Sequence, residues 1–358
     1  MIPGTTQSIG NAKKTSVDSP ESYLQAGWDD AMVTSPGSSF FHGTGWGRTL
    51  VDAYGFSPKC FVHRAPEARP AFLPIMEVNS WLTGRRGISL PFTDACDALY
   101  EHAEEFHRLC GALDAHARSR KWKTWELRGN RALQGQAPAA ASYWGHKLEL
   151  SLRADEMFAR LQGTARTAVR KAEKQNLTVT FTTDMAAVRI FHDLLCKTRQ
   201  RHGLPPQPLH FFECLQRNIL AHQQGWVVLA KHGDTPVAGA VFLHLGKTAI
   251  YKFAASDSSF RDLQANNLVL WRAIEWYAQN GFSCLDFGRT SIANEGLRRF
   301  KRAWGAIEHS IEYLKFDLRA NRFVTMKDQS SGWHTRFVRI LPRPLANLIG
   351  AAAYRHLA

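Results

Sequence analysis

The stretch GWVVLAKHGDTPVAGAVFLHLGKTAIYKFAAS occupies residues 225–256 and consists of apolar runs separated by short turn signals. Gly233-Asp234 and Gly246-Lys247 interrupt it at the two points where a hairpin would reverse the chain. The runs between them are rich in β-branched and aromatic residues, which favour strands. The stretch therefore predicts three successive antiparallel strands.

A helix and two further strands follow. Residues 266–281 place apolar side chains at helical spacing, with Asn266 or Asn267 as the N-cap and Gly281 as the stop. FSCLDFG (282–288) and HSIEYLKFDL (309–318) are each typical of a strand. This order of elements predicts an α/β (α+β) fold with a largely antiparallel mixed sheet flanked by helices.

The segment before residue 225 is predicted to be mostly helical. Apolar side chains recur every three or four positions from Phe158 to Ala172, which predicts one amphipathic helix. Arg166, Arg170 and Lys174 form a cationic stripe along one edge of it. The stripe is either a surface for RNA or a lipid head group, or an ordinary solvated helix face.

The first half of the chain contains another set of strands. Between two of them, residues 99–120 predict a helix that ends in basic side chains. Gly43, Gly45 and Gly47 do not make a dinucleotide fingerprint, because Arg48 stands where the third glycine belongs. Strands are predicted at KCFVHR (59–64), RPAFLPIMEVNSW (69–81), RRGISLPF (85–92), WKTWELRG (122–129) and YWGHKLELSL (143–152).

The composition indicates a globular protein with an anionic partner. The 358 residues are 44% hydrophobic and carry a net charge of +14, which favours nucleic acid, an anionic membrane surface or a phosphate-bearing substrate. The start of the chain has no signal-like apolar core, and no apolar run reaches the roughly 18 residues that span a bilayer. We therefore expect a cytoplasmic protein, at most peripheral at the inner membrane.

Metal-binding patterns are missing from the sequence. The six cysteines are scattered without a CxxC pair, and the 15 histidines show no HExxH spacing. We therefore predict no metal. The sequence does not indicate the oligomeric state.

Four segments are expected along the chain. They are a flexible lead-in (1–25), a first α/β domain (26–152), a second one (153–320) and a basic C-terminal tail (321–358). The tail ends in LPRPLANLIGAAAYRHLA (341–358), which predicts a short amphipathic helix.

Several motifs resemble a known family. RKAEKQNLTV (170–179), HGLP (202–205) and FKRAWGA (300–306) resemble the FemAB-like, or peptidoglycan-bridge-enzyme-like, branch of the GNAT superfamily. FFHGTGW (40–46) and RRGISLPF (85–92) resemble first-domain signatures of its bacterial exosortase- and exopolysaccharide-associated members. The resemblance implies two tandem GNAT-like domains. It also implies an acyltransferase that moves an acyl or aminoacyl group onto an amine of a cell-envelope, peptide or amino-sugar acceptor.

Two departures from the family pattern concern the substrates. Thr93 to Cys96 replace a Tyr-Gly-Gly stretch of several relatives, so the acceptor side differs. The segment SSFRDLQANN (258–267) has no glycine, which weakens an acetyl-CoA interpretation because backbone amides then approach a pyrophosphate less closely. The donor is therefore left open between acyl-CoA and aminoacyl-tRNA, with tRNA as a candidate partner.

The predicted site is the stretch from residue 285 to 306, where a strand ends and a basic loop is expected to follow. The resemblance makes Lys301 the cation that steadies charge on the reacting carbonyl, with Phe300 and Trp304 beside it. Asp286 is a candidate proton acceptor, and the alternative is that it caps the following turn. Arg289 is expected to bind an anionic group, and the alternative is a structural ion pair with Asp286 or Glu275.

Three more residues complete the predicted substrate site: Arg298, Tyr251 and Asn267. Tyr251 and Lys252 should face opposite sides of their strand, and Tyr251 could equally serve strand packing. Two other functions remain open at this point. One is a catalytically silent GNAT-like protein that binds RNA or anionic lipid, and the other is a conventional acetyl-CoA N-acetyltransferase.

Overall fold

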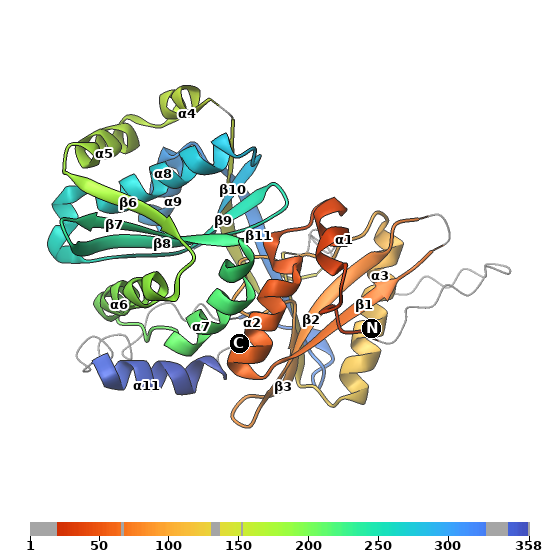
Figure 1. Ribbon diagram of the computed structural model, residues 1–358. Coiled ribbons are helices and arrows are strands. Elements are labelled where there is room, and N and C mark those ends of the chain that lie inside the picture. The colour runs from red at the N-terminus through yellow and green to blue at the C-terminus, as the bar shows by residue number, and fades with distance from the viewer. Residues whose placement is uncertain (1–19, 66–67, 130–136, 152, 327–342, 357–358) are drawn as a thin grey trace.

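The computed structural model (Figure 1) describes residues 20–65, 68–129, 137–151, 153–326 and 343–356. One mixed sheet of 12 strands runs through it, in the order β1-β2-β3-β4-β11-β5-β10-β9-β8-β7-β6, with β12 paired to β11. Residues 1–19 of the predicted lead-in lie outside the described residues. Packed structure begins before residue 26, because Glu21 pairs with Cys60 and Tyr23 is fully buried.

The first half forms one end of the sheet. Its strands are β1 (Ser57–His63), β2 (Ala71–Ser80), β3 (Gly84–Ile88) and β4 (Thr124–Arg128). β1, β2 and β3 are antiparallel neighbours, and β3 pairs with β4 in parallel. The helices of this half are α1 (Trp28–Thr34), α2 (Thr44–Tyr54) and α3 (Ala103–Ser119). The loop and helix expected around the three glycines are therefore present.

The second half forms the other end of the sheet. Its strands are β6 (Leu177–Thr182), β7 (Gly225–His232), β8 (Thr235–Leu245), β9 (Thr248–Ser256) and β10 (Cys284–Ser291). The three predicted strands of residues 225–256 are β7 to β9, and their turns hold Gly233 and Gly246 at φ +58° and +57°. Their helices are α6 (Met185–His202), α7 (Leu209–Asn218) and α8 (Ala265–Gln279).

Two strands join the halves. β5 (Ala141–Glu149) lies between β11 (Ile307–Asp317) and β10, and β11 pairs on its other side with β4. The last long strand of the second half thus extends the sheet of the first half, while β5 fills a place within the second. Because one sheet runs through both halves, the division of the chain into two domains stays a proposal.

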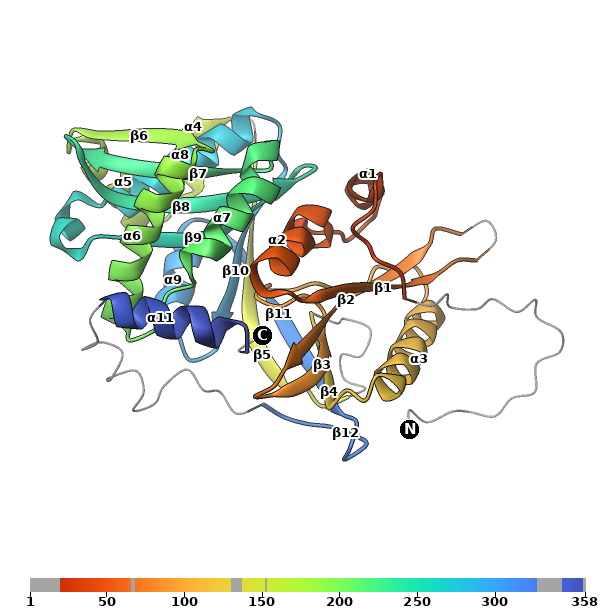
Figure 2. The same ribbon diagram turned by 60° about the horizontal axis from the view of Figure 1, so that its bottom comes forward.

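Helices cover both faces of the sheet (Figures 1 and 2). On one face, a core that includes Trp271, Tyr277 and Trp304 packs α5 and α8 against β8 to β10. On the other face, α2, α6 and α7 enclose a core that includes Trp46 and Phe211. A third core, with Phe106 and Trp125, lies under α3. Tyr251 belongs to the first core and Lys252 faces the second, so the two side chains point to opposite faces as predicted.

Three sequence predictions about helices were wrong in detail. The helix expected from residue 153 onward is two helices, α4 (Ala154–Arg160) and α5 (Gly163–Glu173), because Leu161 and Gln162 are extended. Gln264, and neither Asn266 nor Asn267, precedes the first residue of α8. The basic run at 298–302 belongs to a helix, α9 (Glu295–Ala303), whose N-cap Asn294 accepts a hydrogen bond from the Leu297 amide.

The C-terminal residues contribute two more elements. β12 (Arg322–Phe323) pairs with β11, and α11 (Arg343–Tyr354) is the predicted terminal helix. Residues 327–342 of the predicted tail lie outside the described residues. Within the described ranges, none of the helices combines the length and apolar character that crossing a membrane requires.

The middle of the sheet is irregular where β9 and β10 meet. Their parallel pairing ends at Ile250 and Asp286, although both strands continue. Each strand also carries a bulge against its outer neighbour, at Lys252 in β9 and just after Asp286 in β10. The parting of the two strands exposes backbone and side chains that a regular sheet would cover.

Candidate active site between the two halves

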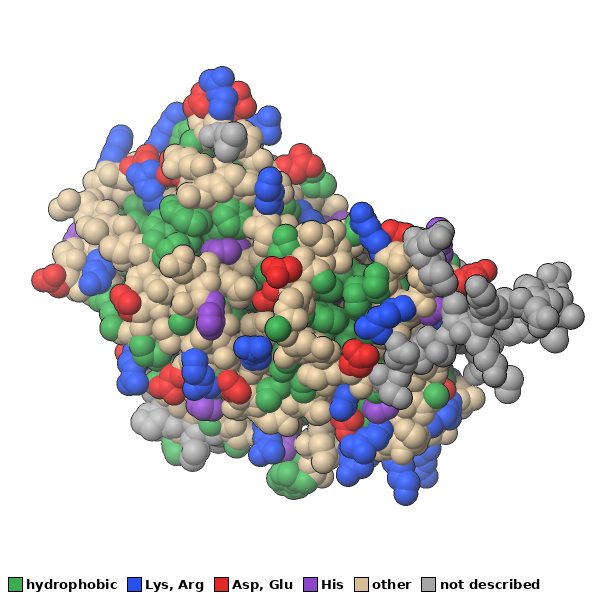
Figure 3. All heavy atoms as spheres, turned by 45° about the vertical axis from the view of Figure 1, so that its right-hand side comes forward, with side chains coloured by type: hydrophobic (Ala, Val, Ile, Leu, Met, Phe, Trp, Pro, Cys, Tyr) green, Lys and Arg blue, Asp and Glu red, His purple; other side chains and the backbone are tan. Residues whose placement is uncertain are grey.

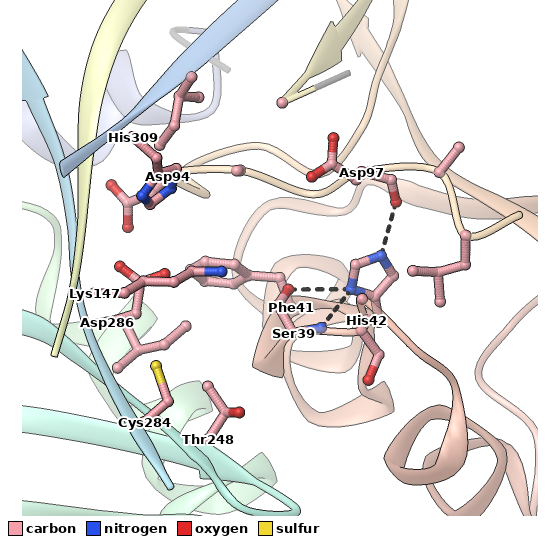
Figure 4. Close-up of a pocket in the computed structure, with 18 of the residues that line it drawn as sticks. Ser39, Phe41, His42, Asp94, Asp97, Lys147, Thr248, Cys284, Asp286 and His309 are labelled. Carbon is pink, nitrogen blue, oxygen red and sulfur yellow. Dashed lines mark hydrogen bonds between the residues drawn. The ribbon is translucent and has the colours of Figure 1, made fainter. Parts of the chain in front are cut away.

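A pocket of about 490 Å³ lies where both halves meet the parted strands. Asp94, Lys147, Asp286 and His309 lie along one side of it, and Ser39 and His42 lie opposite (Figure 4). β5, β10 and β11 supply Lys147, Asp286 and His309. Loops of the first half supply the others, so neither half encloses the pocket alone.

Asp286 is the predicted catalytic residue that lines this pocket. Its Oδ1 accepts a hydrogen bond from the Gly288 amide at 2.7 Å, so the turn-capping interpretation holds alongside the position in the pocket. Burial raises the pKa of the Asp286 carboxyl, and the Asp94 carboxylate adds to the rise. A carboxylate whose pKa is raised accepts a proton more readily, as a general base must.

Asp94 comes from the first half and reaches into the second. Its Oδ2 accepts a hydrogen bond from Lys252 Nζ at 3.0 Å, and that ammonium lies 4.8 Å from the centre of the Phe41 ring. Burial acts to raise the pKa of Asp94, but the charges of Lys252 and Arg289 outweigh it and the pKa is lowered. Asp94 is thus held as a carboxylate beside the parted strands.

Lys301 lies beneath the pocket and does not line it. The side chain comes from α9 and is 4% exposed, and its Nζ donates to the Gly288 carbonyl at 2.8 Å and to the Arg289 carbonyl at 3.1 Å. Burial lowers the pKa of Lys301 from 10.5 to about 8, against the opposing effect of Asp94 and Asp286. The ammonium group therefore fixes the bulge that carries Asp286.

Arg289 follows the same bulge. Its Nη1 donates to the Tyr313 hydroxyl at 2.6 Å, and its guanidinium lies 4.4 Å from the centre of the Tyr143 ring. Among the described residues, Arg289 forms no ion pair with Asp286 or Glu275. Glu275 pairs instead with Arg272. Anion binding by Arg289 stays a prediction.

The other predicted residues lie outside the pocket. Phe300 and Trp304 pack against the core under α8, where Tyr251 also packs. Arg298 pairs with Glu308 at 2.6 Å, while the Nδ2 of Asn267 donates to Gln264. The structure therefore brings Asp286, Arg289 and Lys301 together and leaves these five apart from them.

Sequence reasoning missed the contribution of the first half. His42 is buried, and burial lowers its pKa, so its imidazole is neutral. Its Nδ1 lies 3.0 Å from the Ser39 amide and must accept, which leaves Nε2 to donate to the Asp97 carbonyl at 2.8 Å. The alternation of side-chain directions along β5 and β11 could have shown which face of the sheet Lys147 and His309 occupy. Only the order of the strands in the sheet brings the two residues to one pocket.

Lys301 should make stability depend on pH. The unfolded lysine keeps its proton up to pH about 10.5, so between pH 8 and 10.5 the unfolded state holds more protons and stability rises with pH. Relative to Lys301→Met, the free energy of unfolding of the wild type should grow by about 3 kcal/mol over this window. Urea denaturation of both proteins at the two ends of the window measures it. If the free energies of unfolding of the two proteins changed with pH in parallel, Lys301 would not be a buried lysine with a lowered pKa.

The described residues contain no group of three or more His, Cys, Asp or Glu side chains placed to hold a metal ion.

Comparison with known proteins agrees with this fold. Residues 159–302 match the family model described as an acetyltransferase (GNAT) domain. The chain resembles the crystal structure of FemX, with a TM-score of 0.65 at 13% identity over 79% of this chain and 94% of that one. It also resembles a tandem GNAT protein from the clavulanic acid biosynthesis pathway, with a TM-score of 0.51 at 12% identity over 84% and 97%. No curated protein sequence matches.

The family match spans α5 to α9 and includes both Asp286 and Lys301. The resemblance to FemX extends the likeness to most of the chain at the level of the fold. Residues 159–302 therefore match an acetyltransferase (GNAT) domain, which supports an acyltransferase, and the chain as a whole has a fold similar to that of FemX.

Proposed function

We propose that the protein transfers an acyl or aminoacyl group to an amine of a cell-envelope, peptide or amino-sugar acceptor. The observation that carries this proposal is the position of Asp286: a partly buried carboxyl with a raised pKa that lines a pocket at the parting of β9 and β10.

The proposed reaction is aminolysis of a thioester or ester. The amine nitrogen of the acceptor attacks the carbonyl carbon of the donor, and a C–N bond forms. Asp286 takes the proton that the attacking nitrogen loses. The tetrahedral intermediate then expels a thiolate or an alkoxide as its C–S or C–O bond breaks, and the leaving group is protonated.

The walls of the pocket suit an amine acceptor with further polar groups. Asp94, Asp97 and Asp286 all line it, and carboxylates attract an ammonium group before it loses its proton. Lys147 and His309 on the same wall offer donors for hydroxyl or carboxylate groups. A volume near 490 Å³ accommodates a sugar or a short peptide.

The structure constrains the identity of the donor less than that of the acceptor. Before α8, residues Ser258–Leu263 form a 3-10 helix, and the chain there has no glycine that would let backbone amides approach a pyrophosphate. This supports an aminoacyl-tRNA over an acyl-CoA, because every acyl-CoA carries the same pyrophosphate. The net charge of +14 is compatible with either anionic donor.

A thermal-shift screen tests the donor class. The purified protein is heated with acetyl-CoA, longer acyl-CoAs, charged and deacylated tRNA, and UDP-linked sugar precursors, each at low and high salt. A saturating rise in melting temperature with one donor that persists in salt supports the proposal. Shifts with tRNA alone that vanish in salt would favour a non-catalytic RNA-binding protein.

A further inference from the structure

The C-terminal helix α11 packs its polar side inward. Asn347 Oδ1 accepts a hydrogen bond from the Cys196 thiol at 3.4 Å, and the Tyr354 hydroxyl donates to the Pro205 carbonyl at 3.3 Å. Gly350 is buried between them, so close to the Pro206 carbonyl that a Cβ would lie 2.2 Å from that oxygen. These contacts fix the face of α11 that meets the protein.

The opposite face of α11 is apolar and open to solvent. Leu345 is 48% exposed and Ile349 is 40% exposed, and Ala352 is exposed as well. These residues are four and three positions apart and therefore lie on one side of the helix. An amphipathic helix on a protein surface normally buries such a side, so this face of α11 lacks cover from the described residues.

A second apolar group lies next to the end of α11. The turn between β2 and β3 carries Trp81, which is 86% exposed, and Leu82, which is 62% exposed. The Trp81 ring lies 5.5 Å from the ring of His356, whose Nδ1 is 2.8 Å from the Ser80 hydroxyl. The hairpin tip therefore lies beside the C-terminal end of α11, and Figure 2 shows the helix ending near β3.

Cations surround the hairpin tip. Lys123 extends over Gly84, and its amide donates to the Arg85 carbonyl at 2.8 Å. Arg85, Lys121 and Lys123 are all exposed. Figure 1 places the hairpin at the lower edge of the molecule, and at this edge Figure 3 shows Lys and Arg side chains gathered beside protruding apolar ones.

We propose that this surface docks on an anionic lipid bilayer. Trp81 and Leu82 would enter the interface, α11 would lie in its plane with Leu345 and Ile349 toward the acyl chains, and the cations would meet the head groups. A bilayer supplies both an apolar interior and a negative surface, which the two kinds of side chain require together. RNA offers negative charge but no apolar region for the aliphatic side chains.

Vesicle co-sedimentation of the full chain tests the proposal. The protein should bind vesicles of phosphatidylcholine mixed with phosphatidylglycerol more tightly than vesicles of phosphatidylcholine alone. Trp81→Ser/Leu82→Ser should weaken that binding at least about tenfold, because the change removes the apolar anchor. Lys121→Glu/Lys123→Glu should also weaken it and reduce its dependence on salt.

The control variant is Val33→Ser on α1, away from the hairpin. Val33 is 50% exposed, so the change removes apolar surface outside the proposed docking surface, though less than the loss of Trp81 and Leu82, and should leave vesicle binding unchanged. Melting temperatures near that of the wild type show that the variants fold.

The proposal would be overturned if both vesicle types bound the protein equally, or if the hairpin variant bound vesicles as tightly as the wild type. So would a hairpin variant that dissociates a dimer in the absence of lipid, because the surface would then join two copies. None of these outcomes depends on transfer activity.

Discussion

Asp286→Asn should lower the single-turnover rate of acyl transfer by about 10²- to 10⁴-fold, the range that general base catalysis contributes. Asparagine has nearly the same size, and its oxygen can still accept the Gly288 hydrogen bond, but its amide cannot take the proton of the attacking amine. The rate is measured with saturating donor, and the melting temperature serves as the control for folding.

The pH profile separates this role from a structural one. In the wild type, the transfer rate should fall as the pH drops through the raised pKa of Asp286, because the protonated carboxyl is no longer a base. The variant should lose this acid limb. Asp155→Asn is the matched control, since Asp155 is 70% exposed and pairs with Arg153 at the surface. A variant rate equal to that of the wild type would exclude Asp286 as the base.

Lys301→Ala should lower the transfer rate by about 10²-fold, the cost of a catalytic group misplaced by about 1 Å. The reason is the loss of the two hydrogen bonds from Nζ to the Gly288 and Arg289 carbonyls, which hold the bulge beside Asp286. Donor affinity should change little, since Lys301 does not line the pocket. Steady-state kinetics should therefore show the loss in kcat.

Arg299→Ala provides the control on the same helix. Arg299 is exposed on α9, so its removal alters the charge of the helix without disturbing the buried hydrogen bonds. Its transfer rate should match the wild type. If Lys301→Ala leaves turnover unchanged in an assay that detects the Asp286 effect, Lys301 does not position Asp286.

Local patterns in the sequence predicted most of the strands. Alternating side chains and the turns at Gly233 and Gly246 locate β7, β8 and β9, because these signals depend only on neighbouring residues. The same logic placed Tyr251 and Lys252 on opposite faces. It failed at Leu161 and Gln162, where apolar spacing continues through a break between two helices.

The pocket could not be predicted in the same way. It depends on β5 entering between β10 and β11, and on a loop of the first half that carries Asp94 to Lys252, 158 positions away in the chain. Such pairings leave no local periodicity. The motif around Lys301 predicted a site in this segment, and the basic run there forms a helix that turns Lys301 inward and leaves Arg299 and Arg302 exposed.

The most direct test is a single-turnover transfer experiment followed by mass spectrometry. The donor selected by the thermal-shift screen is mixed with excess wild-type protein and a set of amino sugars and short peptides. We expect one acceptor to gain the mass of the acyl group at its amine, at a rate that Asp286→Asn abolishes. Donor binding without transfer to any amine, in wild type and variant alike, would contradict the assignment of the pocket between the two halves as an acyl-transfer site.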